Sequence, residues 1–410
     1  MASTAAPASS YGRGARILSL GIATTGLVTF AYFSLASHAL SEVDYKGISL
    51  LWSVLFLIVS IIYRPVEQLL SRTIAAGGHP IRIALTIQGA FAALFAAAAL
   101  ALRDYLQDDV FDGSAELYWV LVVAVVAYAA SYFARGWLAG HKRFGLYGGL
   151  VLLESCSRCL FALVAVLGIA TGQGVVAMGI AAAPLVSLVV VPWALSRRRA
   201  PEPEAAGLSL RAGTGFAAGV LVVMAAEQAL LNGPVVLADA ATSDAALAGF
   251  VFNVLLITRA PLQLFQAVQT SLLPHLSSSQ GGQEFRGALR VTVLAIAGFT
   301  AAVVVTLAAA GPPVMDLLFG GDFEYERAGL VLVGLGMGFH LTSGTLNQAA
   351  LARGRTTQAA AAWAGCAVLF LAWMALSPLG DPLWDVEVGY PATTALLAGA
   401  LWLIERGGGR

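Results

Sequence analysis

Twelve apolar stretches, each long enough to cross a bilayer, alternate along this chain with short polar segments. A membrane-spanning helix needs ~20 predominantly apolar residues, so this pattern predicts a polytopic membrane protein. Only 11% of the residues are charged, against ~25% in an average soluble domain. The predicted spans are residues 17–40, 48–70, 83–102, 117–138, 146–170, 175–195, 212–238, 247–272, 289–310, 328–351, 359–376 and 384–404.

The polar segments between these spans alternate in charge. Seventeen of the 23 Lys and Arg residues lie in the segments on one side, and 16 of the 23 Asp and Glu residues lie on the other. Because Lys and Arg concentrate in cytoplasmic segments, we expect both chain termini to be cytoplasmic. A miscounted helix would invert the charge pattern beyond the error, so the alternation supports the count of twelve.

The pattern predicts an all-α integral membrane protein with two lobes of six helices. The second span carries Arg64 and Pro65, and the eighth carries Arg259 and Pro261, so the two halves repeat. Parallel repeats are typical of transporters whose substrate site lies between the repeats near the midplane. The expected units are a disordered cytoplasmic tail (1–16), an N-terminal lobe (17–195), a cytoplasmic linker (196–211) and a C-terminal lobe (212–406).

Composition and loop length argue against several function classes. The net charge is zero, so the chain lacks the basic footprint of a nucleic-acid-binding protein. The longest predicted loop, residues 311–327, is too short for a soluble catalytic domain. The sequence contains no Walker loop, GxSxG motif, HExxH motif or Cys/His metal cluster, so we expect no catalytic residue and no metal site.

The charged residues inside the spans that we take as candidates are Arg64, Glu67, Glu154, Arg158, Glu227 and Arg259, since each costs at least ~2.5–3.5 kcal/mol unless it meets a partner or a cavity. On the second span, Arg64, Glu67 and Gln68 share one helix face. Pro65 removes a backbone donor beside them and frees a carbonyl one turn earlier. These side chains either reach the cytoplasmic interface or line a central cavity that accepts an anionic group.

The eighth span carries a polar stripe. Arg259, Gln263, Gln266 and Gln269 follow one another at spacings of four, three and three residues, which places them on one helix face. Such a stripe either bonds a neighbouring helix or lines water. Four polar residues in register favour a cavity, and the planar guanidinium of Arg259 suits a phosphate group.

Three further spans supply the remaining candidates. Glu154 and Arg158 stand at i and i+4 and can neutralise each other, and the sequence leaves open whether they are structural or functional. Glu227 is a candidate for ion coupling, with the arginine of the eighth span as its alternative partner. Asn347 and His340 lie on the tenth span, where His340 is either a proton relay or a hydrogen-bonded packing residue.

Four segments carry a family resemblance. Residues 64–72 read RPVEQLLSR, residues 135–145 read RGWLAGHKRFG, residues 249–274 end in Leu-Pro, and residues 346–355 read LNQAALARGR. In these segments the chain resembles the polysaccharide flippases of the multidrug/oligosaccharidyl-lipid/polysaccharide exporter superfamily, and the similarity extends over most of its length. The resemblance implies two six-helix lobes arranged as a V around a central cavity, as in the multidrug and toxic compound extrusion (MATE) members.

The resemblance also implies a substrate and a mechanism. The chain would move an undecaprenyl-pyrophosphate-linked oligosaccharide across the bacterial cytoplasmic membrane by alternating access, for surface polysaccharide synthesis. Arg64 and Arg259 would be the cationic cavity residues, together with Glu67 and the glutamines named above. Coupling would use Na⁺ or H⁺ at Glu227 and Asn347, and no other cofactor is expected. Expected partners are the lipid-linked oligosaccharide, the bilayer, and the polymerase or glycosyltransferases of the same synthesis.

Other functions remain open on the sequence. A cation-coupled multidrug antiporter of the same fold would be expected to have excess intramembrane carboxylates, whereas the six candidate charges of these spans are three Arg and three Glu. A membrane glycosyltransferase or polymerase would need a large outer loop, and the acidic cluster of Asp104, Asp108 and Asp109 lies in a short one that we interpret as a solvated turn. The segment 71–82 lacks the acidic-basic signature of major-facilitator transporters, and the first span lacks the basic residues of peptidoglycan-lipid flippases.

Overall fold

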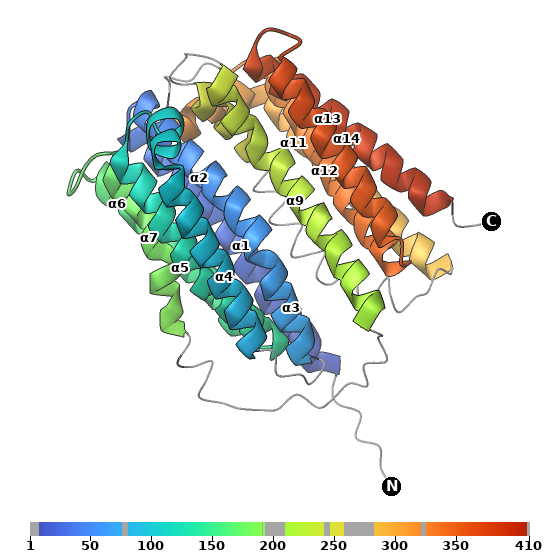
Figure 1. Cartoon of the computed structure of the whole chain (residues 1–410). Coiled ribbons are helices and arrows are strands. Elements are labelled where there is room, and N and C mark those ends of the chain that lie inside the picture. The colour runs from blue at the N-terminus through green and yellow to red at the C-terminus, as the bar shows by residue number, and fades with distance from the viewer. Residues whose placement is uncertain are drawn as a thin grey trace.

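The protein folds into two helical bundles that lie side by side (Figure 1). The structure is a computed structural model, and it describes residues 8–75, 81–190, 192, 210–241, 247–257, 283–320 and 325–407. Every regular element within these ranges is a helix. The start of α1 and the end of α14 lie at the same end of the pair of bundles (Figure 1), as an even number of spans requires.

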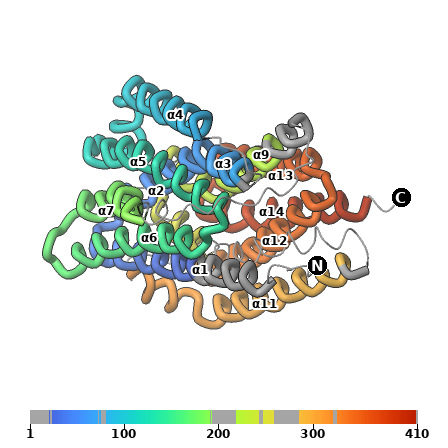
Figure 2. The backbone as a smooth tube through the Cα atoms, turned by 90° about the horizontal axis from the view of Figure 1, so that it is seen from below, coloured from blue at the N-terminus to red at the C-terminus, as the bar shows by residue number. Residues whose placement is uncertain are grey.

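The two bundles follow each other along the chain. The N-terminal bundle contains α1 (Ala8–Ala39), α2 (Glu42–Ile62), α3 (Arg64–Ala75), α4 (Ile81–Ala101), α5 (Ala115–Gly140), α6 (Phe144–Val166) and α7 (Gln173–Ser187), with the short turns η1 (Tyr105–Val110) and η2 (Leu188–Val190). The C-terminal bundle contains α9 (Leu210–Ala241), the helix Leu247–Ile257, α11 (Gln283–Phe319), α12 (Arg327–Ala352), α13 (Thr356–Leu376) and α14 (Pro382–Arg406). Helices α2 and α9 meet at the centre, between the bundles (Figure 2).

Ten helices of the described residues are long and apolar enough to cross a membrane. Helix α1 and the shorter helix Leu247–Ile257 occupy the first and eighth predicted spans. Leu94 on α4 and Val305 on α11 are each 66% exposed, because these helices form the periphery that faces lipid. The predicted class, an all-α integral membrane protein, is confirmed.

Two boundaries differ from the prediction. Helix α1 begins at Ala8, so the second half of the tail predicted to be disordered is helical; no proline follows Pro7 to interrupt it. Helix α11 continues to Phe319, so residues 311–319 of the predicted loop 311–327 are helical. Its backbone leaves helical geometry at Ala310, just before two consecutive prolines, and then resumes because proline is tolerated in the first turn of a new helical segment.

The second span is broken where the candidate site begins. Helix α2 ends at Ile62 and α3 starts at Arg64, with Pro65 in its first turn. Pro65 has no N–H to donate to the preceding turn, and its ring clashes with the carbonyl four residues earlier.

A glycine allows this broken helix to pack closely on its neighbour. A Cβ on Gly136 of α5 would lie 2.8 Å from the Glu67 carbonyl oxygen on α3. We therefore expect Gly136→Ala to destabilise the fold by about 1–3 kcal/mol through overpacking. Thermal unfolding of the purified protein in detergent measures this. Gly149→Ala is the matched control, since Gly149 has nothing within 4 Å of an added Cβ; equal unfolding temperatures for the two variants would contradict this packing.

Candidate functional site between the two bundles

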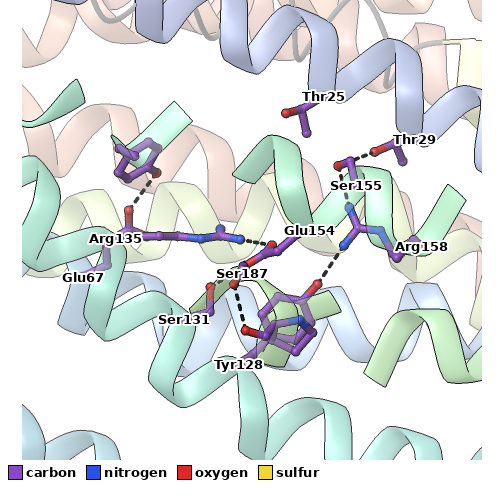
Figure 3. Close-up of polar contacts among 12 residues, drawn as sticks. Thr25, Thr29, Glu67, Tyr128, Ser131, Arg135, Glu154, Ser155, Arg158 and Ser187 are labelled. Atoms are coloured by element: carbon purple, nitrogen blue, oxygen red, sulfur yellow. Dashed lines mark hydrogen bonds and ion pairs between the residues drawn. The ribbon is translucent and has the colours of Figure 1, made fainter. Parts of the chain in front are cut away.

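A buried carboxylate organises the interior of the N-terminal bundle (Figure 3). Glu154 on α6 is 1% exposed and accepts hydrogen bonds from Arg135 and Ser131 on α5. Ser187, the last residue of α7, donates a third bond at 3.2 Å. Removing a charge from water costs several kcal/mol, and the ion pair with Arg135 together with the two hydroxyl groups offsets that cost. One side chain thus joins three helices.

The neighbouring arginine is bound separately. Arg158 on α6 donates to the Tyr128 hydroxyl on α5 at 2.9 Å and to Ser155 at 2.8 Å. Its guanidinium also lies 5.1 Å from the centre of the Trp52 ring on α2. The prediction that Glu154 and Arg158 neutralise each other is wrong, because each binds groups on α5 and the adjacent helices instead (Figure 3).

On α3, two of the three candidate side chains make hydrogen bonds to other helices, and the third makes none to the described residues. Glu67 accepts a hydrogen bond from the Tyr147 hydroxyl on α6 at 2.9 Å. The Gln68 amide lies 3.1 Å from the Met224 sulfur on α9, so it reaches the other bundle. Arg64 is half-buried and makes no hydrogen bond or ion pair with any residue that the structure describes, although Glu67 and Glu227 lie within electrostatic range.

In the C-terminal bundle, Glu227 belongs to a chain of polar groups from three helices. Its carboxylate on α9 is 3.8 Å from His340 Nε2 on α12, and the Glu227 side chain is 21% exposed. The other ring nitrogen of His340 lies 2.8 Å from the Tyr390 hydroxyl on α14. The His340 ring packs edge-on against Trp363 of α13. Glu227 and Tyr390 therefore lie at opposite ends of this chain of polar groups, and the Glu227 end stays partly accessible.

Asn347 lies seven residues after His340 on α12, which places the two on one helix face. It is 5% exposed, and its side-chain oxygen has no hydrogen-bond partner among the described residues. The structure shows no bond between Asn347 and Glu227, the other candidate for ion coupling. The polar stripe predicted on the eighth span lies outside the described residues; its members are Arg259, Gln263, Gln266 and Gln269.

Sequence reasoning missed two buried cations. Arg135, near the end of the predicted span 117–138, was counted with the cytoplasmic cations, but it lies inside α5 and is 9% exposed. Lys46 was assigned to an outer loop, but it lies in α2 and is 6% exposed. For Arg135 a signal existed: Tyr128, Ser131 and Arg135 recur at spacings of three and four, which is a polar helix face.

Comparison with known proteins identifies the fold. No protein-family model matches the chain. Two uncharacterized Mycobacterium tuberculosis proteins, MT1558/MT1560 and Rv1510, are each 27% identical to it over 347 residues, which covers 81% of this chain and 78% of theirs.

The solved structures it resembles are transporters. The Vibrio cholerae MATE transporter VcmN in its bent form has a TM-score of 0.64 at 15% identity, over 97% of this chain and 98% of that one. An inward-facing multidrug resistance MATE family transporter of the MOP superfamily has a TM-score of 0.68 at 15% identity, over 95% and 97%. The eukaryotic MATE transporter AtDTX14 has a TM-score of 0.67 at 15% identity, over 96% of each chain. The chain is a multi-pass membrane protein with the MATE transporter fold.

The buried pair on α5 and α6 gives a stability prediction. Arg135→Gln leaves Glu154 as a buried charge with two hydroxyl partners only, so we expect a loss of about 3–5 kcal/mol. Thermal unfolding in detergent and the yield of monodisperse protein report the effect. The double change Arg135→Met with Glu154→Leu should recover most of the loss, because it removes both charges together.

The control is Arg82→Gln, which removes an exposed arginine from α4. If Arg135→Gln unfolds at the same temperature as Arg82→Gln, the ion pair does not hold the N-terminal bundle together.

Proposed function

We propose that this chain moves a lipid-linked oligosaccharide, carried on undecaprenyl pyrophosphate, from the inner to the outer leaflet of a bacterial cytoplasmic membrane. The movement is alternating access: the pyrophosphate and sugars enter between the bundles, and the bundles then rock about the site. The polyprenyl tail stays in lipid throughout. The MATE transporter fold supports transport of this kind, and the family resemblance of the sequence motifs supports the substrate class.

The observation that carries the proposal is that Arg64 has no bonded partner among the described residues. Arg135 and Arg158, the two described arginines that are buried in the N-terminal bundle, are bound by a carboxylate or by hydroxyl groups. Arg64 alone of these three has no bonded partner among the described residues. An intramembrane guanidinium without a bonded partner is costly unless it serves a ligand. Its planar fork matches two oxygens of a pyrophosphate.

The surroundings of Arg64 suit reversible binding. Glu67, the nearest acidic residue on the same helix, is held by Tyr147 on α6, so it does not neutralise Arg64 through a direct ion pair. Gln68 reaches Met224 of the opposite bundle through a hydrogen bond to sulfur, which is a weak contact that separates easily. An anion between the bundles would therefore meet Arg64 as a free donor, with Gln68 beside it.

Substitution of this arginine tests the proposal. Arg64→Gln should reduce flipping of the lipid-linked oligosaccharide in proteoliposomes by at least about 100-fold, as expected when a charged hydrogen-bonding partner worth ~3 kcal/mol is lost. Its unfolding temperature should match the wild type, since no described bond is broken. A membrane-impermeant glycosidase or lectin added to one side measures the leaflet.

Two comparisons sharpen this test. Arg82→Gln, which removes an exposed arginine, should flip normally, and Arg259→Ala should fail like Arg64→Gln because the sequence assigns it the equivalent place in the other half. Normal flipping by a well-folded Arg64→Gln variant would refute the site assignment.

A second candidate function is a cation-coupled multidrug antiporter, which the partly exposed carboxylate of Glu227 favours. A carboxylate beside a histidine provides a place where an organic cation and a proton or Na⁺ compete. One solved structure of similar fold is a multidrug resistance MATE family transporter.

The same variants separate the two functions. If the chain is an antiporter, Glu227→Gln should abolish efflux of a fluorescent organic cation driven by a proton or sodium gradient, while Arg64→Gln leaves that efflux intact. If it is a flippase, wild-type vesicles should show no gradient-driven efflux of the cation, and lipid-linked oligosaccharide should move.

A further inference from the structure

Among the described residues, most of the hydrogen bonds, ion pairs and aromatic contacts that join the two bundles lie in the half opposite the start of α1 and the end of α14, which we call the outer end from the predicted topology. Among these residues, α1 meets α11 and the helix Leu247–Ile257, and α2 meets α9 and the same helix. The contacts are Phe30 with Phe319, Phe33 with Phe252, Ser34 with the Leu318 carbonyl, Tyr45 with Asn253, and Lys46 with Asp239. Towards the other end, the described residues provide one cross-bundle hydrogen bond, from Gln68 to Met224.

Lys46 is the charged member of this set, and it holds a carboxylate from each bundle. Its ammonium group is 2.6 Å from Asp112, in the turn before α5 of the same bundle. It is 3.1 Å from Asp239, in the last turn of α9 of the other bundle. The Lys46 side chain is 7% exposed, Asp239 is 14% exposed and Asp112 is 59% exposed.

The two carboxylates would behave differently if the bundles separated at this end. Asp239 would leave with α9, whereas Asp112 would stay beside Lys46 because both belong to the N-terminal bundle. An unpaired buried ammonium is costly, so a partner that remains lowers the cost of opening. The Lys46–Asp239 pair is also less exposed than the Lys46–Asp112 pair. The attraction between its charges is therefore stronger than in a surface ion pair.

A neutral contact accompanies the ion pair. The Tyr45 hydroxyl, one residue before Lys46, donates to the Asn253 side-chain oxygen, and the Asn253 amide donates to Tyr325 at 2.9 Å. This contact aligns α2 with the helix Leu247–Ile257 without using charge. Changing the charge of Lys46 or Asp239 therefore tests the ion pair while the neutral contact persists.

We infer that Lys46 is the latch of an outer gate: its ammonium group keeps the outer end closed by holding Asp239 and lets go of it when the bundles part. The inference rests on the alternating-access part of the proposed function. It does not depend on which substrate is carried.

Distances between the bundles test the latch. Spin labels are attached to cysteines placed at Asp109 of η1 and Leu379 of the α13–α14 turn, both exposed, in a protein whose three native cysteines are replaced by alanine. Double electron–electron resonance in lipid nanodiscs then reports the outer separation. Asp239→Asn and Lys46→Met should each raise the ratio of long to short distances by about tenfold or more, as expected for loss of a buried charged partner.

The chain supplies its own matched controls. Asp112→Asn removes a carboxylate from the same ammonium group but within one bundle, and this carboxylate stays beside Lys46 when the bundles part, so its loss should not raise the ratio of long to short distances. Arg103→Met removes an exposed cation that stacks on Tyr118 within the N-terminal bundle, and Lys46→Arg keeps the charge; both should match the wild type. Size-exclusion profiles and unfolding temperatures establish that each variant is folded.

Two outcomes would overturn the inference: Asp239→Asn with the wild-type distribution, or equal shifts for Asp239→Asn and Asp112→Asn. The distances are measured without substrate, so they remain decisive if lipid-linked oligosaccharide is not carried. Normal flipping combined with unchanged distances in Asp239→Asn would refute the latch but would not contradict the proposed function.

Discussion

The structure depends on how an apolar bundle accommodates charge. Glu154 is buried where water cannot solvate it, and its ion pair with Arg135 and hydrogen bonds from two serines replace that solvation. Because these partners come from α5 and α7, satisfying one carboxylate fixes three helices of the N-terminal bundle relative to one another. A hydrophobic contact is non-directional, whereas this bonded group specifies one arrangement.

The same constraint sorts the intramembrane charges by role. Arg135 and Arg158 are bonded to residues within the N-terminal bundle, so their role is structural. Arg64 has no such partner, and Glu227 meets His340 only at 3.8 Å while staying partly exposed. Lys46 holds groups from both bundles. Charges that are not fully committed within one bundle thus lie on or near the surface between the bundles, where a transporter needs them.

Much of the fold was predictable from the sequence, because a membrane-spanning helix can be recognised by its length and apolar composition. The alternating charges of the intervening segments support the number of spans. The end of α11 was not predictable, since Pro312 and Pro313 are equally consistent with a loop and with the first turn of a new helical segment. The face that holds Arg64, Glu67 and Gln68 followed from helical spacing. The partners did not, because periodicity places a residue on a face without saying which helix lies opposite; Glu154 therefore seemed paired with Arg158 rather than with α5.

The most direct test of the account is the composition and sidedness of lipid-linked glycans in a host that lacks this gene. Mass spectrometry identifies the glycans, and a membrane-impermeant lectin or glycosidase assigns their leaflet. The account predicts that one undecaprenyl-linked oligosaccharide accumulates on the cytoplasmic side and disappears on complementation. Unchanged lipid-linked glycans in both leaflets would contradict it and favour the antiporter.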